Sequence, residues 1–357
     1  MSYKDKSHEL ISHLKKLADE LNRTPTRPEF TGSIVGGDYQ LRKHYGNYET
    51  LLMSAGLASN RNKLDADPRL ESKLLQKYKS ICSKKELIQG FYRHTLDLAK
   101  MFELAGNPDI LKVSVQPDTH VKFRDVPAVN SYLKFLKYYQ PDVHLILGDF
   151  PDCEGISHWP NSSMEPRRLI PEMKESRALL QEIADATKKA TTRIYCEGNH
   201  EDWITQGLAR MPELFDGLED FGMEINLSKL LNLDGFGYEL FPMNHLVQIG
   251  NAHFTHGIYC GTHHAKKHLD VFKSNIYYGH VHDSQTFNST SMSGGIEAAA
   301  QGCLCRLDAK FLKGRANNWQ NGHGVFEFRR DGSYSRHFVH IQKGISSFNG
   351  NLFDGNI

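Results

Sequence analysis

Carboxylate, amide and imidazole side chains follow a series of short apolar segments in this sequence. The residues of this set are Asp118, His120, Asp149, Asn199, His200, His256, His280 and His282. Polar side chains at the carboxyl ends of strands line the ligand-binding edge of an open α/β sheet, so we expect this set to converge in space. Oxygen and imidazole donors of this kind suit borderline divalent cations such as manganese, iron or zinc. The pattern predicts a metal site, and the alternative is a set of scattered structural histidines.

The elements that would position these side chains alternate between strand and helix. We expect strands at 111–115, 143–147 and 193–196 and helices at 127–138 and 165–189. Later apolar segments with less helix between them predict a second, more antiparallel sheet, and they cover residues 238–241, 246–249, 252–256 and 275–279. The predicted fold class is α/β or α+β, with two packed mixed β-sheets flanked by helices and a small all-α N-terminal module.

The ordered fragments PDTH, LGDFPD, EGNHE, FTHG and GHVH resemble the calcineurin-like metallophosphoesterase superfamily over roughly residues 111–345. The resemblance implies a four-layer sandwich and a phosphoesterase that uses two divalent cations. It assigns one cation to Asp118, His120 and His282. It assigns the other to Asn199, His256 and His280, with Asp149 bridging both. Manganese is the expected metal, and iron, zinc, magnesium and nickel are the alternatives.

The same resemblance leaves the imidazole of His200 facing the substrate and implies that it protonates the leaving group. Asp152 follows three residues after Asp149 and resembles the carboxylate that orients the catalytic imidazole in protein phosphatases. Such a pair would raise the pKa of the histidine and fix its tautomer. The alternative for Asp152 is a turn cap. Cys303 and Cys305 form an isolated C-x-C, for which we expect core packing.

Residues 7–57 resemble the small helical repeat found beside homing endonucleases. Leucines at 10, 14, 17 and 21 predict a helix over residues 7–21, and shorter helices are expected near 38–45 and 47–55. The resemblance implies DNA contacts by Arg23, Arg27, Arg42 and Lys43. The alternative is a packing or protein-binding cap.

The predicted domains are the helical module at 1–57, a linker and helical connector at 58–109, and the catalytic domain at 110–357. The connector includes a Lys-rich helix at 71–105. A basic stretch that includes Lys313 and Arg315 precedes Trp319, which predicts phosphate attraction beside a stacking surface, or a solvated loop.

Composition narrows the function classes. The formal net charge is +1 and the charged fraction is 24%. We expect a soluble protein of the cytoplasm, and of the host cytoplasm if a phage encodes it. We also expect no membrane partner and reduced cysteines.

The expected function is a nucleic-acid phosphodiesterase, specifically a DNA endonuclease or nickase of bacteriophage type. The alternatives are a phosphomonoesterase acting on nucleotides, nucleic-acid ends or phosphoproteins, and a DNA-binding module with an inactive site. The sequence leaves the oligomeric state open.

Overall fold

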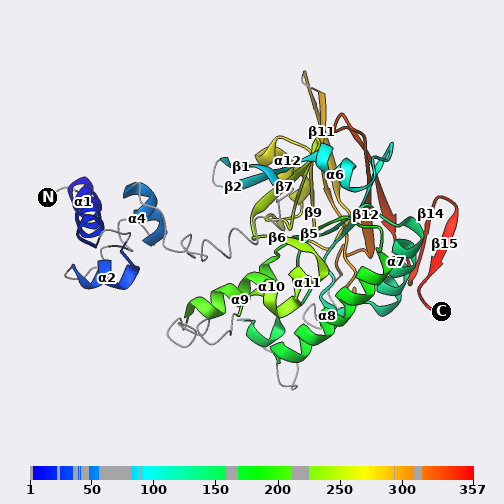
Figure 1. Ribbon diagram of the computed structural model, residues 1–357, viewed down its shortest axis with the longest axis horizontal. Helices are drawn as coiled ribbons and strands as arrows, with labels where there is room; N and C mark the ends of the chain where they lie inside the picture. The colour runs from blue at the N-terminus through cyan, green and yellow to red at the C-terminus, as the bar shows by residue number, and fades with distance from the viewer. Residues whose placement is uncertain are drawn as a thin grey trace. The chain divides into compact units, whose positions relative to one another are not determined.

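The computed structural model describes most of the chain as two compact units, Met1–Ser80 and Ile81–Ile357 (Figure 1). The described residues are 3–21, 25–34, 39, 41, 48–55, 82–88, 91–157, 168–210, 225–292, 294–308 and 316–357. Within these residues, no helix has the length and apolar character needed to span a membrane.

The first unit is helical. Its elements are α1 (Tyr3–Leu21), α2 (Arg27–Gly32) and α4 (Tyr48–Ala55). Thr26 and Glu29 form a capping box that starts α2, because each side chain binds the other residue's backbone N–H. Leucines 10 and 14 of α1 pack on Phe30 and on the buried face of α4. The predicted helices at 7–21 and 47–55 are confirmed, and most of 38–45 lies outside the described residues.

The second unit contains two mixed sheets. The six-stranded sheet has the order β13-β12-β3-β4-β5-β6, and the neighbours from β3 to β6 are parallel. Its strands are β3 (Leu111–Gln116), β4 (Val143–Ile146), β5 (Thr192–Cys196), β6 (Tyr238–Phe241), β12 (Gly322–Phe328) and β13 (Tyr334–His340).

The seven-stranded sheet has the order β1-β2-β7-β8-β9-β11-β10. Its strands are β1 (Cys82–Ile88), β2 (Phe91–Leu96), β7 (His245–Ile249), β8 (Ala252–Thr255), β9 (Ile276–Tyr278), β10 (Thr286–Ser291) and β11 (Gly294–Ala300). A hairpin of β14 (Ile345–Phe348) and β15 (Asn351–Asp354) forms a separate small sheet.

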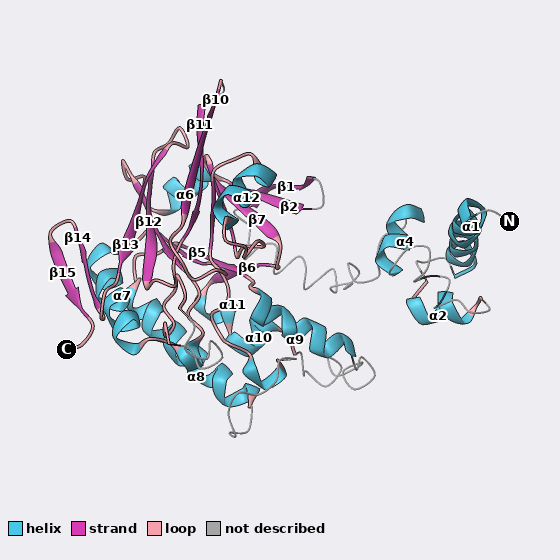
Figure 2. Cartoon of the chain, turned by 180° about the vertical axis from the view of Figure 1, so that it is seen from behind, coloured by secondary structure: helices cyan, strands magenta, loops and turns pink. Residues whose placement is uncertain are grey.

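Alternation along the strands assigns side chains to two cores. On β4, Leu145 faces the core between the two sheets, whereas Ile146 faces the core shared with the helices. That second core includes α7 (Val126–Tyr139) and α8 (Leu169–Ala186), which lie against the six-stranded sheet (Figure 2). On the other side of the unit, α12 (His264–Phe272) packs on the seven-stranded sheet. The layers are therefore helix, sheet, sheet, helix, as predicted.

The remaining helices are short or lie beside the site. They are α6 (Leu98–Leu104), α9 (Asn199–Arg210), α10 (Leu227–Leu231) and α11 (Leu233–Phe236).

Two sequence predictions are corrected. The Lys-rich segment was expected to be helical up to residue 105, but residues 82–88 and 91–96 are paired strands, and β2 joins β7. The second compact unit begins at Ile81, so it includes these strands as well as residues 110–357. Residues 238–241 were assigned to the second sheet, but β6 pairs in parallel with β5 in the first. The pairings of β2 with β7 and of β5 with β6 join segments distant in sequence, so local propensity does not reveal them.

Candidate metal centre

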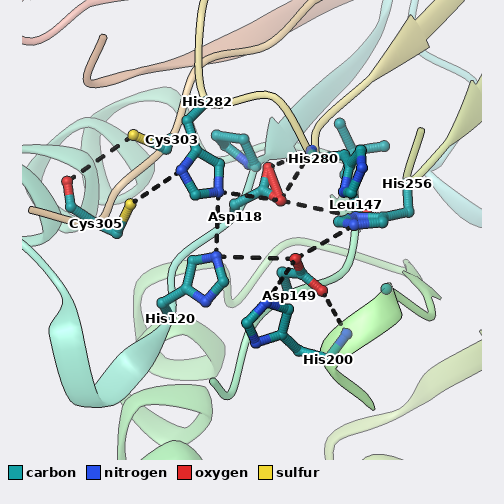
Figure 3. A network of polar contacts seen from close by, with 12 residues as sticks. Asp118, His120, Leu147, Asp149, His200, His256, His280, His282, Cys303 and Cys305 are labelled. Carbon is teal, nitrogen blue, oxygen red and sulfur yellow. Dashed lines mark hydrogen bonds and ion pairs between the residues drawn. The ribbon is translucent and has the colours of Figure 1, made fainter. Parts of the chain in front are cut away.

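The predicted ligands lie together at the carboxyl ends of strands from both sheets (Figure 3). Asp118 and His120 follow β3, Asp149 follows β4, and Asn199 begins α9 after β5. The three histidines from the other sheet follow β8 and β9, and they are His256, His280 and His282. Face-to-face packing of the two sheets thus brings donors from both sheets to one place.

The carboxylate of Asp149 lies at the centre of the cluster. Its Oδ2 is 3.3 Å from Nε2 of His256 and 3.8 Å from Nε2 of both His120 and His200. The amide oxygen of Asn199 is 2.9 Å from Nε2 of His256. The donor group of Asp149, His256 and His280 lies on one side of this carboxylate, and the group of His120 and His200 lies on the other.

Asp118 forms the second acidic part of the cluster. Both of its oxygens accept the backbone N–H of His280, at 2.9 and 2.8 Å. Nε2 of His282 is 3.9 Å from Asp118 Oδ1, and the same nitrogen is 3.1 Å from Nε2 of His120. Asp118, His120 and His282 therefore form a donor group of their own.

Charge balance tests whether cations fit this cluster. Asp118 and Asp149 are 0% and 2% exposed, and every ion pair that the described residues form with them comes from a histidine. Burial raises the pKa of Asp118 to about 7, whereas His256 and His200 outweigh burial and hold the pKa of Asp149 well below its usual range. Buried carboxylates need a compensating positive charge. Divalent cations would supply it, so the donor set fits the predicted metals.

The histidines differ in their proton affinity. Burial lowers the pKa of every buried ring, but Asp152 and Asp149 outweigh it and raise the pKa of His120 to about 10. Asp149 likewise raises the pKa of His256 to about 9 against burial. Burial and the nearby rings lower the pKa of His280 to about 4 and hold that of His282 well below its usual range. Neutral imidazole is the form that binds metals, so cation binding would release protons from His120 and His256.

Four of the predicted ligands have a left-handed backbone. Their φ angles are 43° at His120, 47° at Asp149, 69° at His280 and 63° at His282. A non-glycine residue in this region costs on the order of 1–3 kcal/mol and persists only where the surroundings enforce it. The left-handed conformation recurs at four donors, which indicates that the local backbone directs these side chains to one point.

Two glycines allow the close packing of this centre. A Cβ at Gly198 would lie 2.3 Å from Asp149 Oδ1, and one at Gly279 would lie 2.4 Å from Asp118 Oδ2. Both distances are shorter than van der Waals contact. The glycines in GNH and GHVH therefore make room for the two buried carboxylates.

The predicted pairing of Asp152 with His200 is corrected in its details. The Asp152 carboxylate accepts a hydrogen bond from Nδ1 of His120 at 2.8 Å, whereas Nδ1 of His200 is 3.5 Å away from it. The backbone carbonyl oxygen of Asp152 accepts the Nδ1–H of His200 at 2.6 Å. Asp152 thus fixes the tautomers of both rings, that of His120 through its carboxylate and that of His200 through its carbonyl oxygen. This role goes beyond the turn cap that was the alternative. Burial lowers the pKa of His200.

Glu201 is a further residue of the centre, and no role was predicted for it although the EGNHE fragment contains it. Its fully buried carboxylate accepts backbone N–H groups of Asp149, Phe150 and Gly198 at 2.9–3.0 Å and the hydroxyl of Tyr195 at 2.6 Å. Burial raises the pKa of Glu201 to about 8, which the hydrogen bond from Tyr195 opposes. A signal was available in the sequence, because Glu201 directly follows Asn199 and His200 in the fragment after a predicted buried strand.

Glu172 of α8 was also missed. Its Oε1 accepts the backbone N–H groups of Asp152 at 2.5 Å and Cys153 at 2.8 Å. Burial raises its pKa to about 7. Glu172 and Glu201 hold opposite ends of the segment from Asp149 to Cys153, which carries two site residues. No local pattern identifies Glu172, because it lies within an ordinary helical stretch.

Cys303 and Cys305 are buried, as expected for core packing. They also adjoin the centre, because Cys305 Sγ lies 3.7 Å from Nδ1 of His282. The thiol of Cys305 therefore contacts one nitrogen of His282, whereas the other nitrogen of the same ring faces His120 and Asp118.

The predicted nucleic-acid contacts are mostly beyond the described part of the chain. Arg23, Arg42, Lys43, Lys313 and Arg315 lie outside the described residues. Arg27 is described, and it is exposed at the first residue of α2.

Residues 6–58 match the family model of the homing endonuclease associated repeat, which confirms the resemblance predicted for the N-terminal module. The chain is also similar to the Gene 54 protein of Mycobacterium phage D29. The two are 25% identical over 258 residues, which cover 68% of this chain and 98% of the phage protein. The Gene 54 protein of Mycobacterium phage L5 is 24% identical over 225 residues, which cover 59% of this chain and 86% of that protein.

Solved structures that align with the chain include Vacuolar Protein Sorting 29 from Cryptosporidium parvum. It is 12% identical with a TM-score of 0.39, and the alignment covers 69% of this chain and 100% of that one. Vps29 from Chaetomium thermophilum is 10% identical with a TM-score of 0.31, and the alignment covers 64% of this chain and 97% of that one.

Proposed function

We propose that this protein is a phosphoesterase that uses two divalent cations and hydrolyses phosphodiester bonds in nucleic acid. The observation that carries the proposal is the position of Asp149. Its buried carboxylate lies between donors on two sides, 3.8 Å from His120 and 3.3 Å from His256. A shared carboxylate between two donor groups is the arrangement that a pair of cations requires.

Asp118, His120 and His282 would hold one cation, and Asn199, His256 and His280 the other, with Asp149 bridging. When bound, two such cations supply Lewis-acid polarisation of the phosphoryl oxygens and acidify the attacking water. Manganese is our first choice, because carboxylate, amide and imidazole donors suit it and no thiolate is needed. The chain itself orients the donors through Asp152, Glu201 and the left-handed backbone.

His200 is the residue we assign to proton transfer. The carbonyl oxygen of Asp152 can only accept, so the Nδ1 of His200 carries a hydrogen and Nε2 points toward Asp149 at 3.8 Å. Protonated at Nε2, the ring would donate to the leaving oxygen and return to the neutral tautomer that Asp152 already fixes.

The N-terminal module supports nucleic acid as the substrate. Residues 6–58 match a repeat associated with homing endonucleases, and α2 presents Arg27 to solvent. An exposed arginine suits phosphate contact. The relatives of the chain are proteins of Mycobacterium phages D29 and L5, which supports an action in the cytoplasm of an infected cell. Together with the repeat, this leads us to propose DNA as the substrate and an endonuclease or nickase as the activity.

The test is cleavage of supercoiled plasmid by chelator-treated protein before and after addition of manganese. We expect wild type to nick or linearise the plasmid only with metal. His280→Ala should lose at least tenfold in rate, because it removes a predicted ligand. His340→Ala is the matched control, since His340 is an exposed histidine on β13 outside the centre.

Equal cleavage by wild type and His280→Ala would exclude this site as the source of the activity. If plasmid stays intact while p-nitrophenyl phosphate is hydrolysed, the nucleic-acid part of the proposal fails and the phosphomonoesterase alternative replaces it.

A further inference from the structure

A polar surface cavity of about 420 Å³, open to solvent, adjoins the metal centre outside the donor groups described above. Two short segments line it, one directly after His282 and one before β12. The lining residues are Asp283, Ser284, Gln285, Asn317, Asn318, Trp319 and Gln320. The cavity is large enough for a nucleoside, because ligand sites begin at roughly 300 Å³.

Trp319 connects this cavity to the centre. Its ring meets the ring of His282 edge-on, with centroids 4.3 Å apart and planes at 69°. The backbone N–H of Gln320 also binds the carbonyl oxygen of His282 at 2.8 Å. The cavity and the centre therefore share a wall, and a ligand in the cavity lies within one residue of a predicted metal ligand.

The walls are held by hydrogen bonds that leave them little freedom. Asn317 accepts the backbone N–H of Trp319 at 2.9 Å and donates to the carbonyl oxygen of Leu307 at 3.0 Å. On the opposite segment, the buried Asp283 is 2.9 Å from Nε2 of His264. Ordered walls reduce the entropy cost of binding a rigid ligand.

The chemistry of the lining selects the ligand. The described residues of the lining offer one buried carboxylate, one indole, amides and a hydroxyl. The carboxylate disfavours a phosphate group in the same space. Amides match the hydrogen-bonding edges of a nucleobase, and an indole provides a surface on which a base stacks.

We propose that this cavity, walled by Trp319 and the amides of Asn317, Asn318 and Gln320, binds the nucleobase of the nucleotide whose phosphate lies at the metal centre. This inference rests on the proposed function and deepens it, because it makes the enzyme recognise one base beside the bond that it cleaves. A free nucleotide and a base in a single strand share this chemistry.

The test compares phosphodiesters that carry a nucleoside with one that carries none, and nucleotide esters that differ only in the base. The nucleotide substrates are the 5′- and 3′-p-nitrophenyl phosphates of thymidine and deoxyadenosine, and the base-free reference is methyl p-nitrophenyl phosphate. We expect wild type to prefer at least one nucleotide ester. Trp319→Ala should lower the ratio of kcat/KM for that ester to kcat/KM for the reference about tenfold, through loss of base stacking.

Asn318→Ala should lower the same ratio, and Trp319→Phe, which keeps an aromatic ring, should retain most of it. Asn288→Ala is the matched control, because Asn288 is an exposed asparagine on β10 away from the cavity. Bound manganese is measured in each variant, because Trp319 touches His282. A parallel fall for all esters together with loss of manganese would show that Trp319 only supports the metal ligand, and it would overturn the proposal.

Repeating the comparison with a single-stranded oligonucleotide distinguishes the two sources of the base. An effect on the oligonucleotide alone assigns the cavity to a strand. If wild type hydrolyses no ester at all, the proposed function has failed, and the cavity is then tested by saturation-transfer NMR with thymidine. Thymidine binding that Trp319→Ala abolishes would retain the base site, and absence of binding would remove it.

Discussion

Replacing Glu201 with glutamine tests whether this buried carboxylate organises the centre. Glutamine accepts through one oxygen only, whereas the two oxygens of Glu201 accept three backbone N–H groups and the hydroxyl of Tyr195. If the amide nitrogen takes the position of Oε2, the N–H groups of Asp149 and Gly198 lose their acceptor. If it takes the position of Oε1, the Tyr195 hydroxyl can turn and accept, but the N–H of Phe150 loses its partner.

At least one buried N–H is thus left without an acceptor, which costs about 1–3 kcal/mol. Above about pH 8, where Glu201 is ionised, the remaining hydrogen bonds also lose their charge assistance. At about pH 9 we expect Glu201→Gln to lower the free energy of unfolding of metal-free protein by about 2–4 kcal/mol. Manganese affinity should fall about 10- to 100-fold, because the segment that carries Asp149 loosens.

Urea denaturation of chelator-treated protein measures the first effect, and titration with manganese measures the second. Glu182→Gln is the matched control, since Glu182 is exposed on α8, and it should change stability by less than about 0.5 kcal/mol. If Glu201→Gln matched this control in both measurements, the role assigned to Glu201 would be wrong.

Two further predictions concern burial and close packing. His323 is fully buried between the rings of Tyr132 and Phe135, and burial lowers its pKa from 6.5 to about 3. Below about pH 6.5, His323 binds a proton in the unfolded chain but stays neutral in the folded chain down to about pH 3. The free energy of unfolding therefore decreases as the pH falls from 6.5 toward 3. Between pH 7.5 and 5, wild type should lose about 2 kcal/mol more free energy of unfolding than His323→Phe. Urea denaturation at the two pH values measures this difference. Identical losses in the two proteins would contradict the prediction. Gly279→Ala should displace Asp118 and weaken manganese binding at least tenfold by titration, because its Cβ would lie 2.4 Å from a carboxylate oxygen. Gly207→Ala, with no atom within 4 Å of its Cβ in α9, should instead stabilise the protein by about 0.5–1 kcal/mol and leave manganese binding intact, and equal effects of the two alanines would refute the steric argument.

The sequence by itself determined the local features of this protein. Short buried segments of β-branched and aromatic residues became the strands, and a polar residue shortly after β3, β4, β5, β8 and β9 became a candidate site residue. Asp118, Asp149 and His256 were predictable because the end of a strand and the residue that follows it are local in the chain. The order of the layers followed from the alternation of strands and helices.

Only the tertiary structure decided the partners of these residues. The segment CSKKELI contains good helix formers, yet it is the edge strand β1 because β2 provides a ladder of hydrogen bonds, and its lysines suit an exposed edge. Asp152 was expected to orient His200 through its carboxylate, but the turn directs that carboxylate to His120. Glu172 reaches the same turn from a helix that lies 20 residues along the chain. The contacts of Asp152 and Glu172, and the pairing of β2 with β7 that adds the β1–β2 hairpin to the sheet, join elements distant in sequence, which no local spacing encodes.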